Sequence, residues 1–156
     1  MKALIISDSH GNIKNLKHVV GFGKKIGVGA VIHCGDWNTL HSIEVVIDSK
    51  IPFYSVLGNA DIDPGVGELL KSKGSFDPEI LFFVLNGKKI AISHYVSRLK
   101  KEIENIDIGF YGHRHTPEKS MFKGKKLVRP GALEKNINFV VYDTNTDKIE
   151  FINEEF

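Results

Sequence analysis

His113 and His115 are separated by one residue and follow an apolar run that extends from Asp107 to Tyr111. In an extended strand alternate side chains lie on one face, so both imidazoles can enter the same pocket while Arg114 points away. Neutral imidazole is a common metal ligand in proteins. The pair alone fits two interpretations, metal ligands at the end of a strand or histidines on a solvated loop.

Four other segments place polar side chains directly after apolar, β-branched runs: Asp8-Ser9-His10, Gly35-Asp36, Gly58-Asn59 and Ser93-His94. Each segment therefore offers candidate ligands at the end of an expected strand. With the histidine pair, they supply seven oxygen or imidazole donors and no thiolate: Asp8, His10, Asp36, Asn59, His94, His113 and His115. This set fits two divalent cations, with Asp36 as the candidate bridging carboxylate.

Two metal ions about 3.5–4 Å apart polarise a phosphoryl group and lower the pKa of a bound water, which supplies hydroxide at neutral pH. Mixed histidine and aspartate donors suit several metals, so we expect two divalent ions, Mn first and Ni, Zn, Fe or Co as alternatives. Two dications exceed the charge of Asp8 and Asp36, and the resulting positive pocket favours an anionic substrate. Glycines beside the ligands allow sharp backbone turns and a close approach of substrate: Gly11, Gly35, Gly58 and Gly112.

The elements that must position these residues alternate in the first half of the chain. Unbroken apolar runs predict buried strands, and apolar residues at helical spacing predict amphipathic helices. We expect strands at Lys2–Ser7, Ala30–Cys34 and Phe53–Leu57, and helices from the cap Asn12 to Ile26, over Leu40–Ser49 and over Gly67–Lys73. Asp63-Pro64-Gly65 indicates a turn. This half is typical of βαβ units.

Short strands dominate the second half. Asn86-Gly87 supplies the positive φ angles of a type I′ turn and predicts a hairpin of Ile80–Leu85 with Lys88–Ser93. We expect a helix over Val96–Ile106, then strands at Asp107–Tyr111, Glu118–Phe122, Lys125–Arg129, Phe139–Tyr142 and Lys148–Ile152. This half is expected to be mostly antiparallel. The fold class is therefore α/β, with two packed mixed sheets flanked by helices.

The length of 156 residues suits a single domain over 1–156. The net charge is +2 and the lysines are dispersed, so we expect no nucleic-acid partner other than a small nucleotide substrate. The single cysteine excludes an internal disulfide, and no apolar run reaches transmembrane length. We expect a cytoplasmic protein that binds no membrane. It is either a monomer or a homodimer, because the apolar run Leu81-Phe82-Phe83-Val84 fits a dimer contact or a buried hairpin.

The ordered set D-x-H, G-D, G-N, a single H and G-H-x-H over residues 1 to about 115 resembles the calcineurin-like metallophosphoesterases. The likeness is greatest to the small, single-domain bacterial and archaeal phosphodiesterases, and it includes Arg129-Pro130-Gly131-Ala132. The resemblance implies a four-layer αββα sandwich. It also implies two ligand sets, Asp8, His10, Asp36 and His115 for one metal and Asp36, Asn59, His94 and His113 for the other.

The function implied is that of a metal-dependent phosphodiesterase, in which a metal-bridging hydroxide attacks a small phosphodiester. Asp36, Asn59 and His94 would be catalytic, and Arg114 would clamp the phosphate or lie on the surface. Many relatives carry a histidine after Gly-Asn that protonates the leaving group, whereas this chain has Ala60. The departure weakens the phosphomonoesterase alternative more than the diesterase one. A second alternative is a non-catalytic scaffold on the same fold, similar to the small metallophosphoesterase-like subunit of the retromer coat.

Several neighbouring residues carry two interpretations each. His33 and His41 could compensate for the missing histidine, or be a hydrogen-bonded strand residue and an exposed helix residue. Cys34 is a small buried thiol or a ligand. Trp37 stacks on an aromatic leaving group or packs against the next helix. Asp61 supports Asn59 and its turn instead of binding metal.

Overall fold

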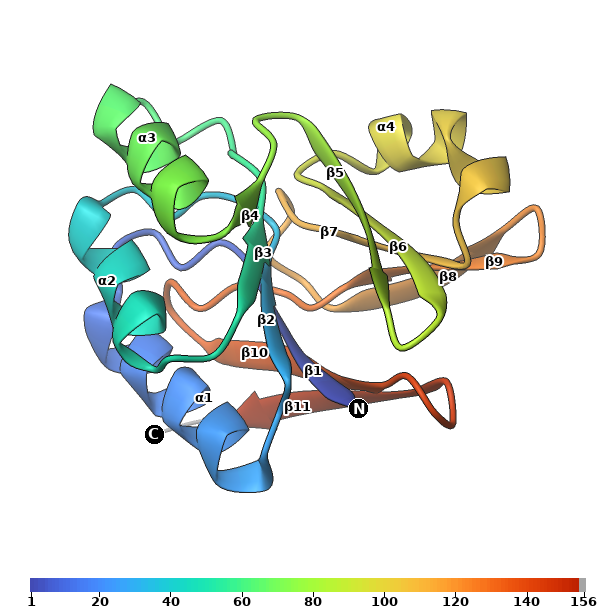
Figure 1. Ribbon diagram of the computed structural model, residues 1–156, viewed down its shortest axis with the longest axis horizontal. Coiled ribbons are helices and arrows are strands. Elements are labelled where there is room, and N and C mark those ends of the chain that lie inside the picture. The colour runs from blue at the N-terminus through green and yellow to red at the C-terminus, as the bar shows by residue number, and fades with distance from the viewer. Residues whose placement is uncertain (155–156) are drawn as a thin grey trace.

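The computed structural model describes residues 1–154 and contains two β-sheets packed face to face (Figure 1). The first sheet has the strand order β11-β10-β1-β2-β3-β4, in which β1 to β4 run parallel while β10 and β11 are antiparallel to their neighbours. Its strands are β1 (Lys2–Ile6), β2 (Ala30–His33), β3 (Phe53–Ser55), β4 (Ser75–Phe76), β10 (Ile137–Asp143) and β11 (Lys148–Glu154).

The second sheet has the order β5-β6-β7-β9-β8. Its three central strands run parallel, and each edge strand pairs antiparallel. The strands are β5 (Ile80–Leu85), β6 (Lys88–Ser93), β7 (Ile108–Tyr111), β8 (Glu118–Phe122) and β9 (Lys125–Arg129). The expectation of a mostly antiparallel second half is therefore wrong for the β6-β7-β9 core of this sheet.

Helices cover the outer face of each sheet and complete the predicted four-layer αββα sandwich (Figure 1). The first sheet is covered by α1 (Ile13–Ile26), α2 (Leu40–Asp48) and α3 (Pro64–Lys73), and the second by α4 (Val96–Lys101) with the 3₁₀ turn η1 (Ile103–Asn105). Within residues 1–154, no helix is both long and apolar enough to cross a membrane. The expected single domain, 1–156, includes two residues outside the described part and stays a prediction.

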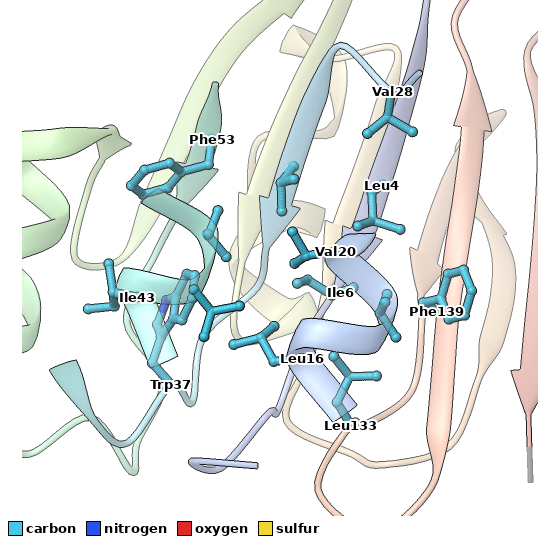
Figure 2. Packing of buried hydrophobic residues seen from close by; sticks show 14 of the residues in the cluster. Leu4, Ile6, Leu16, Val20, Val28, Trp37, Ile43, Phe53, Leu133 and Phe139 are labelled. Atoms are coloured by element: carbon cyan, nitrogen blue, oxygen red, sulfur yellow. The ribbon is translucent and has the colours of Figure 1, made fainter. Parts of the chain in front are cut away.

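Strand β1 shows why an unbroken apolar run is needed at the centre of these layers. Ala3 and Ile5 pack between the two sheets, whereas Leu4 and Ile6 pack under the helices. Figure 2 shows Ile6 beside Leu16 of α1 and Leu4 nearer to Val20 and Val28. Lys2 at the start of the strand is exposed, but from Ala3 to Ile6 both faces are covered and carry apolar side chains. Polar side chains return where the strand ends and the candidate ligands begin.

The helix boundaries differ from expectation in two places. Helix α3 begins at Pro64, because Asp63 caps it with its side chain and proline suits the first helical turn; the predicted turn is its N-terminus. The helix expected over Val96–Ile106 ends at Lys101 and continues as η1. Strand β4 was not expected.

The apolar run on β5 is half buried. Leu81 and Phe83 pack between the sheets, with Phe83 stacked on Tyr54. Phe82 and Val84 point outward and are 47% and 61% exposed. Burial of the hairpin therefore explains only alternate residues of this run.

Asn12 joins the start of α1 to the loop before β10. Its side-chain oxygen accepts from the Asn15 N–H, and its amide donates to the Glu134 carbonyl at 2.7 Å. We expect Asn12→Ala to lower the free energy of unfolding by about 2 kcal/mol, since it removes a cap and a second hydrogen bond. Asn12→Asp keeps the capping acceptor and should lose about 1 kcal/mol. Urea denaturation measures both; an alanine variant as stable as the natural chain would contradict this assignment.

Candidate metal centre

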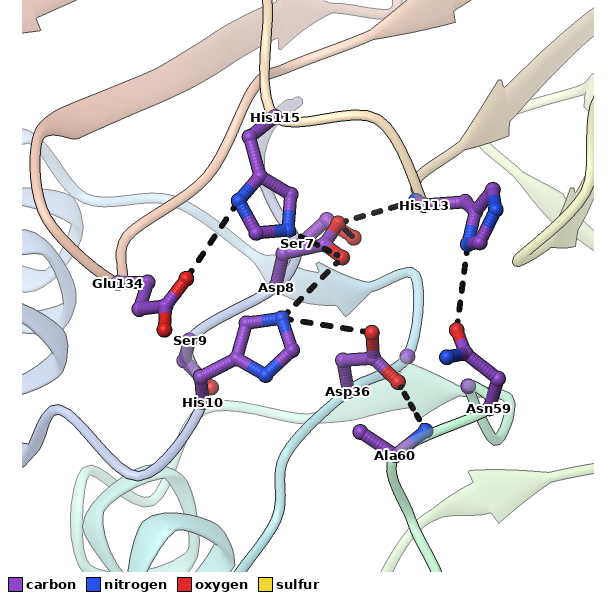
Figure 3. Close-up of polar contacts among 12 residues, drawn as sticks. Ser7, Asp8, Ser9, His10, Asp36, Asn59, Ala60, His113, His115 and Glu134 are labelled. Carbon is purple, nitrogen blue, oxygen red and sulfur yellow. Dashed lines mark hydrogen bonds and ion pairs between the residues drawn. The ribbon is translucent and has the colours of Figure 1, made fainter.

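All seven predicted donors lie together where strands of both sheets end. Figure 3 labels six of them, all except His94. Asp8 and His10 follow β1, Asp36 follows β2 and Asn59 follows β3. His94 follows β6, and the pair His113 and His115 follows β7. The carboxyl ends of parallel strands meet at one edge of a sheet, and here the ends from two sheets face each other. This is the position at which α/β proteins bind their ligands.

One group of donors surrounds Asp8. Its Oδ1 lies 3.7 Å from His10 Nε2 and 3.6 Å from His115 Nε2. His10 Nε2 is also 3.4 Å from Asp36 Oδ2. The ligand atoms of Asp8, His10 and His115 lie within 4.8 Å of one another, a spacing that one metal ion could span.

The second group surrounds His94, which is fully buried. His94 Nε2 lies 3.3 Å from Asp36 Oδ2 and 3.0 Å from Asn59 Oδ1, which is itself 3.2 Å from His113 Nδ1. Asp36 Oδ2 therefore lies between His10 of the first group and His94 of the second. This position suits a carboxylate shared by two metals, and the bridging role stays a prediction.

Contacts outside the donor set orient two of the imidazoles. His94 Nδ1 donates to the Cys34 carbonyl at 2.8 Å, so Nε2 is the ring nitrogen that faces the centre and that a metal would bind in place of a proton. His115 Nδ1 is 3.5 Å from Glu134 Oε2, which orients that ring with Nε2 toward Asp8. Such outer contacts fix the ring nitrogen available to a metal.

Two buried atoms in this centre, Asp8 Oδ1 and His10 Nε2, have no hydrogen-bond partner among the described residues. The third such atom in the described chain, Asn38 Oδ1, lies outside the donor set. A buried polar atom without a partner costs about 1–3 kcal/mol, so native structures rarely leave one. A cation satisfies both atoms at once, and the donor set therefore fits a metal.

The two carboxylates have opposite pKa shifts. Burial raises the pKa of Asp8 to about 6, although the Ser7 hydroxyl donates to its Oδ2 at 2.5 Å. Burial would also raise the pKa of Asp36, but hydrogen bonds from His94 and the Ala60 N–H lower it to about 2. Asp36 is therefore ionised at neutral pH without metal, whereas Asp8 depends on a neighbouring cation to be fully ionised.

Four of the seven donors adopt left-handed backbone conformations, which non-glycine residues rarely do. The φ angles are 52° at Asp8, 44° at His10, 64° at Asp36 and 76° at His113. Hydrogen bonds between loops hold them: the Asp8 N–H donates to the Gly35 carbonyl and the His10 N–H to the Asp36 carbonyl, each at 3.0 Å. Backbone strain of this kind collects at functional sites.

Two of the glycines make room for the protein's own carboxylates, a role that was not expected; the close approach of substrate stays a prediction. A Cβ at Gly58 would lie 2.1 Å from Asp36 Oδ1, and one at Gly112 would lie 2.7 Å from Asp8 Oδ2. Only a residue without a side chain allows the loops after β3 and β7 to approach so closely.

Asp61 supports the ligand loops, in agreement with its expected role. Its carboxylate accepts from the backbone N–H groups of Asp36, Asn38 and Gly58 at 2.8–2.9 Å. Burial raises the pKa of Asp61, and these three donors oppose that shift. One side chain thus joins the loops that carry Asp36 and Asn59.

His33 and Trp37 form a buried pair behind the site. Their rings stack with centroids 3.7 Å apart, and the Trp37 indole donates to Ser55 Oγ at 2.8 Å. His33 Nδ1 accepts from the Gly35 N–H, so Nε2 carries the proton and donates to Ser9 Oγ at 3.0 Å. Burial lowers the pKa of His33 to about 3. Neither residue can reach a substrate, which rules out the proposed proton donor and stacking roles.

The other residues with two interpretations are also placed. His41 is an exposed residue of α2 beside Glu44, and Cys34 is a buried thiol. Arg114 lines a small cavity with His94 and His113, and its catalytic role stays a prediction.

Sequence reasoning missed Ser7 and Glu134, which contact Asp8 and His115. Ser7 ends an apolar run next to a ligand, which is a weak signal. Glu134 follows the last motif at no distinctive spacing.

The close approach at Gly58 predicts a site-specific effect of Gly58→Ala. The new methyl group would displace Asp36, so we expect lost metal affinity and a loss of about 2 kcal/mol or more in stability. Gly67→Ala on α3 is the matched control, since its methyl meets nothing nearer than 3.7 Å and a helical alanine should gain up to about 1 kcal/mol. Calorimetric metal titration and urea denaturation measure both; metal affinity unchanged by Gly58→Ala would contradict the packing described.

The raised pKa of Asp8 predicts that the metal-free protein is destabilised by its own ligand. Above pH 6 the folded chain must ionise a buried carboxyl whose pKa of about 6 exceeds the usual 3.8. In chelator, Asp8→Asn should therefore be more stable than the natural chain at pH 8 by about 2–3 kcal/mol. The advantage should shrink as pH falls below 6 and vanish near pH 4. Denaturation across this range tests it, and a variant that is less stable at pH 8 refutes it.

Comparison with known proteins agrees with this geometry. The chain is 27% identical over 143 residues to a Bacillus subtilis (strain 168) protein named "Probable metallophosphoesterase YsnB", which covers 85% of this chain and 75% of that protein. A structure described as a novel archaeal phosphodiesterase superposes with a TM-score of 0.88 at 23% identity, covering 99% of this chain and 100% of that one. Vps29 of Entamoeba histolytica in complex with Zn²⁺ superposes with a TM-score of 0.68 at 16% identity, covering 98% and 99%.

At these identities the two structures support the fold. The profile of the calcineurin-like phosphoesterase superfamily domain matches residues 1–147, nearly the whole chain. This protein is therefore a member of the calcineurin-like phosphoesterase superfamily.

Proposed function

We propose that this protein is a metal-dependent phosphodiesterase that hydrolyses a small phosphodiester at the centre formed by the seven donors. The observation that carries the proposal is that two buried polar atoms of this centre, Asp8 Oδ1 and His10 Nε2, have no hydrogen-bond partner within the described chain. Two divalent cations bound there would polarise the phosphoryl group and supply hydroxide at neutral pH.

The chain's own residues hold and orient this chemistry. Asp36 offers Oδ2 to both donor groups while the Ala60 N–H holds its Oδ1 at 2.8 Å. The Cys34 carbonyl accepts from His94 Nδ1 and so holds Nε2 toward the centre. These contacts fix the ligand geometry in advance, which reduces reorganisation during the reaction.

The preference for a diester is supported by Ala60. Its methyl side chain cannot donate a proton, and a general acid contributes typically about 10²–10⁴-fold. The site should therefore prefer substrates whose leaving group needs little protonation. The archaeal protein with the similar structure is described as a phosphodiesterase, which agrees with this choice.

The test is hydrolysis of bis-p-nitrophenyl phosphate beside p-nitrophenyl phosphate, by protein stripped with chelator and resupplied with Mn, Ni, Zn or Mg. We expect metal to restore diester turnover and the monoester to react more slowly. A faster monoester reaction would favour a phosphomonoesterase. No hydrolysis of either ester with any of the metals would favour a non-catalytic scaffold.

A single variant tests the shared carboxylate. Asp36→Asn should reduce metal-restored diester turnover by at least about 100-fold, since even partners of metal ligands are worth about 10–100-fold. Asp48→Asn, at the exposed end of α2, is the matched control and should keep full turnover. Full activity in Asp36→Asn would show that the bridging role is wrong.

A further inference from the structure

A second cavity, of about 310 Å³, lies beside the metal centre on the outer side of the second sheet. Its walls come from α4, from β7 and the loop that follows it, and from β8 and the end of β9. Helix α4 is only six residues long and packs against β6 and β7 (Figure 1), so it leaves a hollow toward β8. The volume is at the lower end of the range for small-molecule sites, about 300–1,000 Å³.

This cavity adjoins the proposed catalytic centre. A smaller cavity of about 140 Å³ is lined by His94 and His113 of the centre. The two cavities share Tyr111, Arg114 and Arg129 as lining residues. One ligand can therefore place a phosphoryl group at the metal centre and extend into the larger cavity.

The charges of the larger cavity do not cancel. Arg129 is neutralised by Glu118 at 2.8 Å and also donates to the Thr116 carbonyl and hydroxyl. Lys100 and Arg114 form no ion pair within residues 1–154 and line the same cavity. The cavity thus presents two uncompensated cations, which attract an anion.

The remaining surface is apolar and aromatic. Phe122, Val96 and Met121 line the cavity, and Lys100 Nζ lies 5.3 Å from the centre of the Phe122 ring. Such a wall accepts a flat or apolar group on the way to the cations.

We propose that the larger cavity binds one ester arm of the substrate, and that this arm carries a second phosphate. Two cations match the charge of a phosphate dianion, and the planar guanidinium of Arg114 suits its oxygens. Lys100 is then a specificity residue that acts on the arm and not on the reacting phosphorus. The proposal rests on the phosphodiesterase function and names its substrate class.

A matched pair of esters tests the proposal in the metal-loaded protein: thymidine 5′-(p-nitrophenyl phosphate) and the same compound with a 3′-phosphate. Both release p-nitrophenol, so they differ only in the arm. We expect the 3′-phosphate to lower KM about tenfold, the size of one charge-assisted hydrogen bond. Equal KM values for the two esters would overturn the proposal.

Two variants of α4 separate a local contact from a general effect of charge. Lys100→Met keeps the aliphatic stem on Phe122 and removes one charge, and Lys101→Met removes one charge from the neighbouring exposed position. Lys100→Met should lose at least about fivefold of the preference for the 3′-phosphate through KM. Lys101→Met should keep the preference. An equal loss in both variants would overturn the proposal.

A binding measurement separates this proposal from the phosphodiesterase proposal. Calorimetry with thymidine 3′,5′-bisphosphate and thymidine 5′-monophosphate requires no turnover. We expect the bisphosphate to bind more tightly to the natural chain and to lose that advantage in Lys100→Met. If it does so while no diester is hydrolysed, only the catalytic proposal fails. If diesters are hydrolysed and the two nucleotides bind alike, only the arm site fails.

Discussion

Asp8 and Asp36 are buried carboxylates that lie on either side of His10, and each raises the cost of ionising the other. A protein interior tolerates such a pair only where every oxygen has a donor or a cation. One oxygen of each carboxylate is satisfied by the chain, Asp8 Oδ2 by the Ser7 hydroxyl and the His113 N–H and Asp36 Oδ1 by the Ala60 N–H. The other oxygen of each carboxylate faces the imidazoles. The chain thus satisfies one oxygen of each carboxylate, and a metal ion is the partner that the donor set fits at the other.

The need to supply hydrogen-bond donors to buried carboxylates is reflected in the loops that carry the ligands. The chain turns sharply at the strand ends, where Asp8, Asp36 and His113 have left-handed conformations. In these turns the His113 N–H donates to Asp8 and the Asp36 N–H to Asp61. Asp61 accepts from the N–H groups of two loops with one carboxylate. Gly58 allows these loops to approach each other closely. The left-handed residues and the hydrogen bonds that hold them are therefore parts of one arrangement.

The sequence predicted what short-range patterns determine. The run Lys2–Ser7 is buried on both faces, so it predicted a central strand, and Asn86-Gly87 predicted the β5–β6 hairpin because one turn type requires it. The gathering of the seven donors followed from their places after apolar runs. Strand partners did not follow, because the parallel pairing of β7 with β9 skips the strand β8 that lies between them in the chain. Glu134 and the packing role of Gly58 were missed because each depends on a contact between two loops, Glu134 with His115 and Gly58 with Asp36.

The substitution at Ala60 affects the side chain and spares the backbone. The Ala60 N–H donates to Asp36 Oδ1 at 2.8 Å, so the backbone of the turn still positions that carboxylate. The methyl side chain lacks the proton donor that a histidine would supply at this position. In the proposed reaction, such a centre would rely on charge stabilisation and on the acidity of the leaving group. Selectivity among phosphodiesters would then come from groups away from the reacting phosphorus. The uncompensated cations Lys100 and Arg114 lie beside the ligands, in the hollow left by the short helix α4. Loss of the proton donor and exposure of this hollow are consistent with an enzyme that recognises its substrate by an arm of the molecule.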